Sequence, residues 1–229
     1  MNKNEISKKM GGRILESYYD YTSVTNLVYE GLDFGLDCIQ VFPNMLPKVK
    51  EVLNGRKLDV CAVIAYPHGT FLPEHKVFEI EDALQSGADQ VEFVIHNINV
   101  RSGNWDLVRD EFQACRKATG DKILKAIVEV EWLTDEQIQK VAQLAVEEGI
   151  DRLVTSVGVY TQPDENKNDK LIQCTAKDVQ VIKEVVGDKV SVVAQGGIDS
   201  VEMVEALINA GADYVSSEFA ADILRSMSK

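Results

Sequence analysis

The stretch Asp151-Arg-Leu-Val-Thr-Ser-Val-Gly-Val-Tyr160 decides the fold. It is a short apolar run rich in β-branched residues, it follows a long helical pattern, and a glycine closes it. Such a run is typical of a buried parallel strand that ends in a loop. Similar runs occur at residues 38–42, 60–66, 91–95, 126–130, 190–194 and 214–217. The amphipathic patterns between them have the length that a βα crossover needs.

This order of patterns predicts an α/β protein, a single (β/α)8 TIM barrel over residues 1–229. An open flavodoxin-like sheet is the alternative, but so many βα units in one series fit it poorly. We place the first strand at residues 13–19 and the sixth at 153–157. Helices are expected at residues 23–35, 46–53, 77–87, 105–118, 175–186 and 200–210, and Thr134 opens another with a capping box. Residues 161–173 are polar and too long for a minimal βα loop, which indicates an inserted loop or lid after strand six.

Composition limits the classes of partner and compartment. The formal net charge is −13 and the acidic residues are dispersed, which argues against nucleic acid or an anionic membrane as a partner. A local basic pocket remains compatible with a small anionic substrate. No apolar stretch approaches a membrane span, and the charged N-terminus lacks a signal-peptide pattern, so we expect a cytoplasmic protein. The four scattered cysteines are expected to be apolar core residues instead of metal ligands or disulfides.

Five motifs lie at or near the predicted strand ends. They are Val41-Phe-Pro43, Val63-Ile-Ala-Tyr-Pro-His-Gly69, Gly87-Ala-Asp-Gln-Val-Glu-Phe-Val-Ile95, Arg101-Ser-Gly103, and Lys125-Ala-Ile-Val-Glu129 with Leu133-Thr134. In this order they resemble the deoxyribose-phosphate aldolase family, and the resemblance covers most of the chain, from about Leu27 to the last helix. No single motif is specific, but five in the family's order point to homology.

The chain departs from that family where its chemistry is performed. The resemblance implies a Schiff-base lysine on strand six, and Val154 stands there. Val193 replaces the second lysine on strand seven, and Glu92 replaces an aspartate on strand four. The terminal phosphate-binding segment is replaced by one that contains Glu218. Valine cannot form an iminium, and an added anion disfavours a phosphate.

The active face of a TIM barrel is formed by the loops after its strands, so candidate residues are sought there. Lys125 is the only lysine on a predicted strand, and two interpretations stay open for it. It is either a catalytic base or relocated nucleophile, or half of a buried ion pair with Glu92 or Glu129. If a Schiff base forms, Lys125 is expected to form it, because the other lysines are predicted on helices, the insert or turns, where water keeps an amine protonated.

Further acidic, histidine, hydroxyl and glycine residues near the predicted strand ends are candidates for catalysis or binding. Glu92, Glu129 and His96 join Lys125 as predicted catalytic residues, with Glu92 either a general acid–base group or a structural partner of that lysine. A metal held by Glu92, His96, Glu129 and Glu131 is disfavoured, because no typical ligand spacing supports it. The predicted substrate-binding residues are His68, Thr155, Ser156, Gly158, Gly196, Gly197, Ser217 and Glu218. The double glycine either presents backbone N–H groups to an anion or makes a tight connection.

The sequence therefore predicts an aldolase-like carbon–carbon lyase that acts on a small carbonyl or sugar-derived substrate, with an altered substrate or mechanism. A homologue that has lost catalysis and serves as a ligand-binding or assembly protein is the alternative. We expect no cofactor and no metal, and a homodimer is compatible with the sequence.

Overall fold

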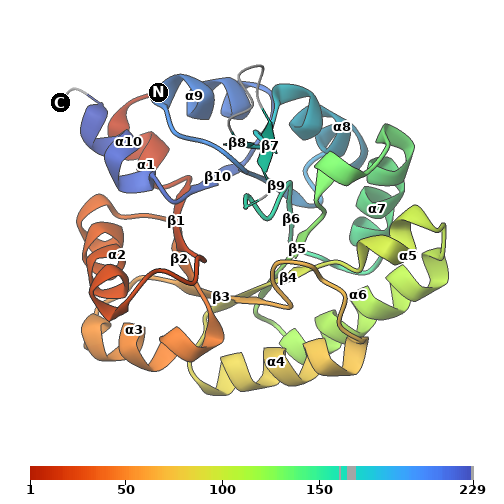
Figure 1. The fold of residues 1–229 in the computed structure, drawn as a ribbon, viewed down its shortest axis with the longest axis horizontal. Coiled ribbons are helices and arrows are strands. Elements are labelled where there is room, and N and C mark those ends of the chain that lie inside the picture. Colours follow the sequence, from red (N-terminus) through yellow and green to blue (C-terminus); the bar gives the residue numbers. More distant parts are fainter. Residues whose placement is uncertain (160, 164–168, 228–229) are drawn as a thin grey trace.

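The computed structural model describes residues 1–159, 161–163 and 169–227. Eight parallel strands close into a barrel in the order β1-β10-β9-β6-β5-β4-β3-β2, and helices surround it (Figure 1). The predicted (β/α)8 TIM barrel is confirmed. Within the described residues, no helix is long and apolar enough to cross a membrane.

The barrel strands are short and almost wholly buried. They are β1 (Met10–Ile14), β2 (Cys38–Val41), β3 (Val60–Ile64), β4 (Gln90–Val94), β5 (Ile123–Ile127), β6 (Arg152–Val154), β9 (Ser191–Gln195) and β10 (Tyr214–Ser217). One face of each strand packs against the helices and the other fills the barrel. Burial of both faces explains why the sequence shows apolar runs instead of strict alternation.

The helices lie outside the barrel (Figure 1). Their bounds are α1 (Lys3–Ser7), α2 (Tyr21–Phe34), α3 (Leu46–Leu53), α4 (Pro73–Gln85), α5 (Asn97–Arg101), α6 (Trp105–Thr119), α7 (Asp135–Glu147), α8 (Ala176–Val186), α9 (Val201–Asn209) and α10 (Ala220–Ser226), with 3-10 turns η1 (Pro43–Met45) and η2 (Val130–Trp132). The predicted capping box at Thr134 is present, with Gln137 as its second member.

The segment between β6 and α8 contains an additional pair of short strands. β7 (Thr161–Pro163) pairs antiparallel with β8 (Asp169–Leu171). The predicted insert at residues 161–173 falls on this segment, while residues 164–168 and Tyr160 lie outside the described residues. Its role as a lid stays a prediction.

The predicted first strand at residues 13–19 is wrong in its bounds, because β1 is Met10–Ile14. Two glycines at its centre hide the apolar pattern of a strand. A Cβ on Gly12 would lie 2.9 Å from Leu27 and 3.1 Å from Leu36, so the glycine allows α2 and the following loop to approach the strand. Because the packing of Leu27 and Leu36 requires glycine here, β1 lacks the apolar side chains by which a strand is recognised in a sequence.

Several other elements differ from their predicted bounds. The sixth strand, predicted over residues 153–157, is Arg152–Val154. The apolar run at residues 126–130 belongs to β5 only as far as Ile127, because Glu129 adopts a left-handed backbone conformation with φ 55° and ψ 59°. Residues 96–103, for which no helix is predicted, contain the single-turn helix α5. A helix of one turn offers too few residues for a period of 3.6 to be recognised.

Lys76 contradicts the expectation that lysines on helices or turns remain in water. The predicted helix at 77–87 begins at Pro73, so Lys76 lies on α4, where its side chain is completely buried. Its ammonium donates to the Val94 carbonyl at 2.7 Å and pairs with Glu111 of α6. The Glu111 carboxylate also accepts the backbone N–H of His96 at 3.1 Å. This buried pair thus fixes the end of β4.

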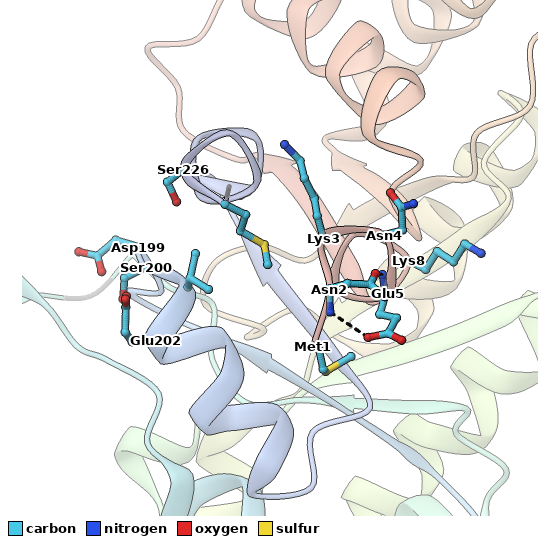
Figure 2. Close-up of a pocket in the computed structure, with 12 residues that line it drawn as sticks. Met1, Asn2, Lys3, Asn4, Glu5, Lys8, Asp199, Ser200, Glu202 and Ser226 are labelled. Carbon is cyan, nitrogen blue, oxygen red and sulfur yellow. Dashed lines mark hydrogen bonds between the residues drawn. The ribbon is translucent and has the colours of Figure 1, made fainter. Parts of the chain in front are cut away.

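A large cavity lies outside the barrel, between α1, the start of α9 and the end of α10 (Figure 2). Its volume is about 1060 Å³. Asn2 caps α1 reciprocally with Glu5, and the N-terminal ammonium is 3.2 Å from Glu205 of α9. None of the predicted functional residues lines this cavity, so the candidate site is built elsewhere.

Candidate active site

A chain of polar side chains crosses the barrel interior. Ser216 Oγ donates to Gln40 Oε1 at 2.5 Å, and Gln40 Nε2 donates to Glu92 Oε2 at 2.9 Å. The same carboxylate oxygen lies 4.0 Å from Lys125 Nζ, on the neighbouring strand and in register with it. Burial raises the pKa of Glu92, while Lys125 and Arg13 act in the opposite direction. Two predicted catalytic residues, Glu92 and Lys125, therefore form an interior pair.

Lys125 has the surroundings of a buried cation. Its side chain is 1% exposed, and Nζ donates to Cys38 Sγ at 3.3 Å. Burial opposes its charge, but Cys38, Cys61 and Glu92 outweigh burial, so the pKa of Lys125 is raised. A raised pKa leaves little of the neutral amine that attacks a carbonyl. The geometry favours the ion-pair interpretation of Lys125.

A second ion pair lies toward the N-terminal ends of the strands. Arg152 is in register with Lys125 and donates to Asp37, the residue that precedes β2, at 2.6 and 3.3 Å. Its guanidinium also lies 3.8 Å from the centroid of the Tyr214 ring. Lys125 thus sits between Glu92 and this pair, within the barrel. All four cysteines of the chain are free and buried, as predicted.

Apolar side chains occupy the positions where the sequence comparison expected lysines. Val154 and Val193 are 0% and 2% exposed and belong to one cluster of interior apolar residues. Val63, Val94 and Ile127 from three further strands complete this layer. An amine is therefore absent from these two positions, and their neighbours are adapted to valine.

Arg13, which the sequence analysis did not select, brings a different cation into the interior. Its guanidinium donates to the Val157 carbonyl at 2.9 Å and lies 3.4 Å from the Tyr66 hydroxyl. A Cβ on Gly158 would lie 2.5 Å from Arg13 Nη1, so the glycine makes room for the guanidinium. Gly158, predicted to bind substrate, here accommodates an arginine. The only signal in the sequence was a charged residue directly after two glycines.

A cavity opens among the loops that follow β3, β4 and β5, on the face where TIM-barrel active sites lie. Its volume is about 530 Å³. We call it the rim cavity; its lining residues are His68, Thr70, Asn97, Ile98, Arg101, Glu129 and Trp132. It brings together His68 and Glu129, which the sequence analysis selected. Asn97 and Arg101 were missed as site residues, because α5 was not recognised.

Glu129 is the most constrained acidic residue of the rim cavity. It is 3% exposed, and its carboxylate accepts a hydrogen bond from Asn97 Nδ2 at 2.6 Å. Its φ of 55° lies in the left-handed region, which costs a residue other than glycine about 1–3 kcal/mol. Strain of this kind is concentrated at functional sites, so the conformation itself points to a role for this carboxylate.

His96 and Asn97 join the rim cavity to the buried pair below it. The backbone N–H of His96 is held by Glu111, and its ring Nδ1 is buried without a hydrogen-bond partner. Asn97 Nδ2 donates to the Val128 carbonyl as well as to Glu129. His96 thus lies at the entry to α5, but it does not line the rim cavity. Among the described residues, no group of three or more potential ligands could hold a metal ion.

Ser156 and Glu131 form a second polar pair beside a cavity of about 440 Å³. Ser156 Oγ donates to Glu131 Oε1 at 2.6 Å and accepts the backbone N–H of Gly158 at 3.0 Å. Glu131 Oε2 is buried and has no hydrogen-bond partner within the part of the chain that the structure describes. Burial raises the pKa of Glu131, although the bond from Ser156 lowers it. Trp132 lines both this cavity and the rim cavity.

We expect Glu131→Gln to make the free energy of unfolding less dependent on pH. Since the folded state raises the pKa of Glu131, the wild type loses stability as the pH rises from the ordinary carboxyl pKa through the raised one. Glutamine cannot ionise and can still accept the bond from Ser156. The difference is at most about 1.4 kcal/mol for each pH unit of the shift. Urea unfolding at several pH values measures it, and parallel curves for the two proteins would contradict the assignment.

Thr155 and Ser217 make hydrogen bonds that hold the barrel together. Thr155 Oγ1 donates to the Gln195 carbonyl at 2.8 Å and accepts its N–H at 2.9 Å. Ser217 Oγ donates to the Ile198 carbonyl at 2.6 Å and accepts the N–H of Phe219 at 2.9 Å. These contacts support a structural role for both hydroxyls.

The double glycine lies against the segment that follows β8. The Gly196 carbonyl accepts the N–H of Cys174 at 3.0 Å, and the Gly197 carbonyl accepts Gln173 Nε2 at 3.2 Å. A Cβ on Gly197 would lie 2.8 Å from Gln173 Cγ. The glycines therefore permit a close approach of two segments, which supports the tight-connection interpretation.

Glu218 brings negative charge to the rim near the end of β1. Burial is the main cause that raises the pKa of Glu16, and the charge of Glu218 raises it further, against Arg13. Glu218 therefore adds negative charge to the segment where the resemblance placed a phosphate site. That a phosphate is disfavoured there stays a prediction.

Comparison with known proteins identifies the family of the chain. A protein-family model described as "DeoC/LacD family aldolase" matches residues 3–215. The chain belongs to the DeoC/LacD family of aldolases. The deoxyribose-phosphate aldolase of Staphylococcus carnosus is 32% identical over 223 residues, which are 97% of each chain. That of Clostridioides difficile is 30% identical over 220 residues, 96% of this chain and 95% of its own.

Solved structures of aldolases share the fold. An aldolase called QR15 has a TM-score of 0.87 at 25% identity, with 96% of this chain and 95% of that chain covered. A tetrameric deoxyribose phosphate aldolase from Aeropyrum pernix has a TM-score of 0.85 at 22% identity, with 98% and 92% covered. The structures support the fold, while membership of the DeoC/LacD family rests on the sequence matches over nearly the whole chain.

Proposed function

We propose that this DeoC/LacD-family aldolase is a carbon–carbon lyase that cleaves a small carbonyl or sugar-derived substrate in the rim cavity, without a Schiff base on strand six. The observation that carries the proposal is Glu129: a buried, strained carboxylate that lines a cavity at the active face. The reaction class follows from membership of the family. The mechanism is proposed to differ because Val154 cannot form an iminium.

The proposed reaction is a retro-aldol cleavage with Glu129 as general base and acid. Its carboxylate removes the proton from the hydroxyl group β to the substrate carbonyl. The oxygen forms a new carbonyl, the carbon–carbon bond breaks, and its electron pair passes to the enolate of the other fragment. Glu129 then returns the proton to the enolate carbon, so atoms and charge balance. In this proposal the His68 imidazole, which lines the same cavity, donates a hydrogen bond to the enolate oxygen.

The other predicted catalytic residues act indirectly in this proposal. Glu92 and Lys125 are 0% and 1% exposed, line no described cavity, and balance each other's charge within the barrel. His96 begins α5 and positions Asn97, which in turn orients Glu129.

We expect borohydride treatment in the presence of candidate carbonyl substrates to leave Lys125 unmodified. Its raised pKa and complete burial keep the amine protonated and away from solvent. Peptide mass spectrometry after reduction measures the adduct, with a lysine-dependent aldolase as a positive control. Cleavage of deoxyribose 5-phosphate is expected to be absent or very slow, because Val154 cannot form an iminium and Glu218 disfavours a phosphate. An adduct on Lys125, or turnover at a rate normal for an aldolase, would show that the chain uses an iminium.

A coupled assay over short-chain aldol compounds tests the proposal as a whole. Release of an aldehyde from at least one compound, without a trapped adduct, is the expected result. No release from any compound, with the folded protein at high concentration, would contradict a lyase activity.

A further inference from the structure

Arg101 differs from the other arginines of the chain in its hydrogen bonds and ion pairs among the described residues. The chain has seven arginines. Six of them bind carboxylates or carbonyl oxygens within the protein, namely Arg13, Arg56, Arg109, Arg116, Arg152 and Arg225. Arg101 lines the rim cavity, and among the described contacts it makes no hydrogen bond or ion pair. In a protein with a net charge of −13, an arginine without a carboxylate partner is available to bind an anionic ligand.

Asn97, which lines the same cavity, also has a polar atom without a partner. It is 9% exposed, its Nδ2 donates to Glu129 and to the Val128 carbonyl, and its buried Oδ1 has no hydrogen-bond partner among the described residues. Asn97 and Arg101 are four residues apart on α5, so they lie on one face of that helix. A buried acceptor without a donor costs free energy, which a ligand hydroxyl would recover.

The charged residues that line the rim cavity indicate which class of anion it would bind. Arg101 is the only arginine or lysine that lines it, and the Glu129 carboxylate lies in the same cavity. One cation beside one carboxylate suits a monoanion better than a doubly charged phosphate. A planar guanidinium also matches a carboxylate in a two-bond arrangement.

We infer that the rim cavity binds a short hydroxycarboxylate, with its carboxylate on Arg101 and a hydroxyl group donating to Asn97 Oδ1. This inference rests on the proposed function and names its substrate class: the aldol that is cleaved carries a carboxylate in place of a phosphate. The hydroxyl held by Asn97 is then next to the Glu129 carboxylate, which Asn97 itself contacts.

Isothermal titration calorimetry with three probes that share a three-carbon skeleton tests this inference. Glycerate offers a carboxylate and hydroxyls, glycerol 3-phosphate offers a phosphate, and glycerol is neutral. We expect glycerate to bind, with Arg101→Gln weakening the binding about tenfold to a hundredfold. Arg101→Lys is expected to retain part of the affinity, because it keeps the charge and loses the planar fork. Asn97→Leu should weaken glycerate binding too.

Arg56→Gln is the matched control, since it removes the same charge from an arginine that follows α3 and does not line the rim cavity. The Arg56 guanidinium donates to the Val52 and Leu53 carbonyls and lies over the Tyr29 ring. This variant should leave glycerate binding unchanged. Equal or tighter binding of glycerol 3-phosphate, an unaltered affinity in Arg101→Gln, or no binding of glycerate would each overturn the inference. Calorimetry needs no turnover: glycerate binding through Arg101 without any cleavage activity would refute the proposed function alone. Cleavage of neutral aldols by an active Arg101→Gln variant would refute this inference alone.

Discussion

Lys76→Met is expected to lower the free energy of unfolding by about 3–5 kcal/mol, since it leaves a buried carboxylate without its partner. Lys76 and Glu111 are 0% and 1% exposed, and the lysine also bonds to the Val94 carbonyl. The pair joins α4 to α6 and holds the backbone of His96. Urea unfolding followed by circular dichroism measures the change, which is among the largest that one substitution should produce here.

Two further variants separate the charge from the packing. In Lys76→Met combined with Glu111→Leu, no charge remains buried, so the loss of stability should be much smaller than in Lys76→Met alone. Lys177→Met breaks the exposed pair with Asp135 and should cost no more than about 1 kcal/mol. Equal losses for the buried and exposed pairs would contradict the role assigned to Lys76.

Glu129→Gln should lower kcat by about 10²- to 10⁴-fold while KM changes little. Glutamine has nearly the same shape but cannot take a proton from the substrate hydroxyl. The measurement is steady-state kinetics on whichever hydroxycarboxylate aldol the wild type cleaves. Glu136→Gln alters an exposed carboxylate in the first turn of α7 and serves as the control. Full activity in Glu129→Gln would remove Glu129 from the mechanism.

Glu129→Gly adds a test of the strained backbone. Glycine adopts a φ of 55° without strain, so part of the 1–3 kcal/mol cost should be recovered as stability. Activity should be lost as in the glutamine variant. A large loss of stability would show that the bond from Asn97 outweighs the strain.

The barrel was predictable from the sequence because most strands are buried on both faces and stand out as apolar runs. The helix at Leu46–Leu53 was predicted with its observed bounds, since Pro43 ends the preceding segment and the apolar spacing is regular. β1 was misplaced, because two glycines and Arg13 give it no recognisable pattern. Its place depends on Leu27 and Leu36 packing over Gly12, which is a property of the folded molecule.

The candidate site was predicted in part. An ion pair of Lys125 with Glu92 was one of the alternatives that the sequence left open. In the structure the two residues are in register on neighbouring strands and their charged groups lie 4.0 Å apart. The side chains that line the rim cavity depend on loop conformation instead. Asn97 and Arg101 converge only because a one-turn helix forms there, and Glu129 faces the cavity only because its backbone leaves the strand. No periodicity in the sequence records either event.

The guanidinium of Arg13 defines the electrostatic surroundings that a lysine at position 154 would meet. It occupies the barrel interior beside the loop after β6, and Gly158 makes room for it. Lys125 and Arg152 add two more buried cations. A lysine introduced at position 154 would be a fourth basic group in that interior. Burial and neighbouring positive charges both lower the pKa of an amine, so in Val154→Lys the new amine is expected to be neutral and nucleophilic instead of adding a fourth buried charge.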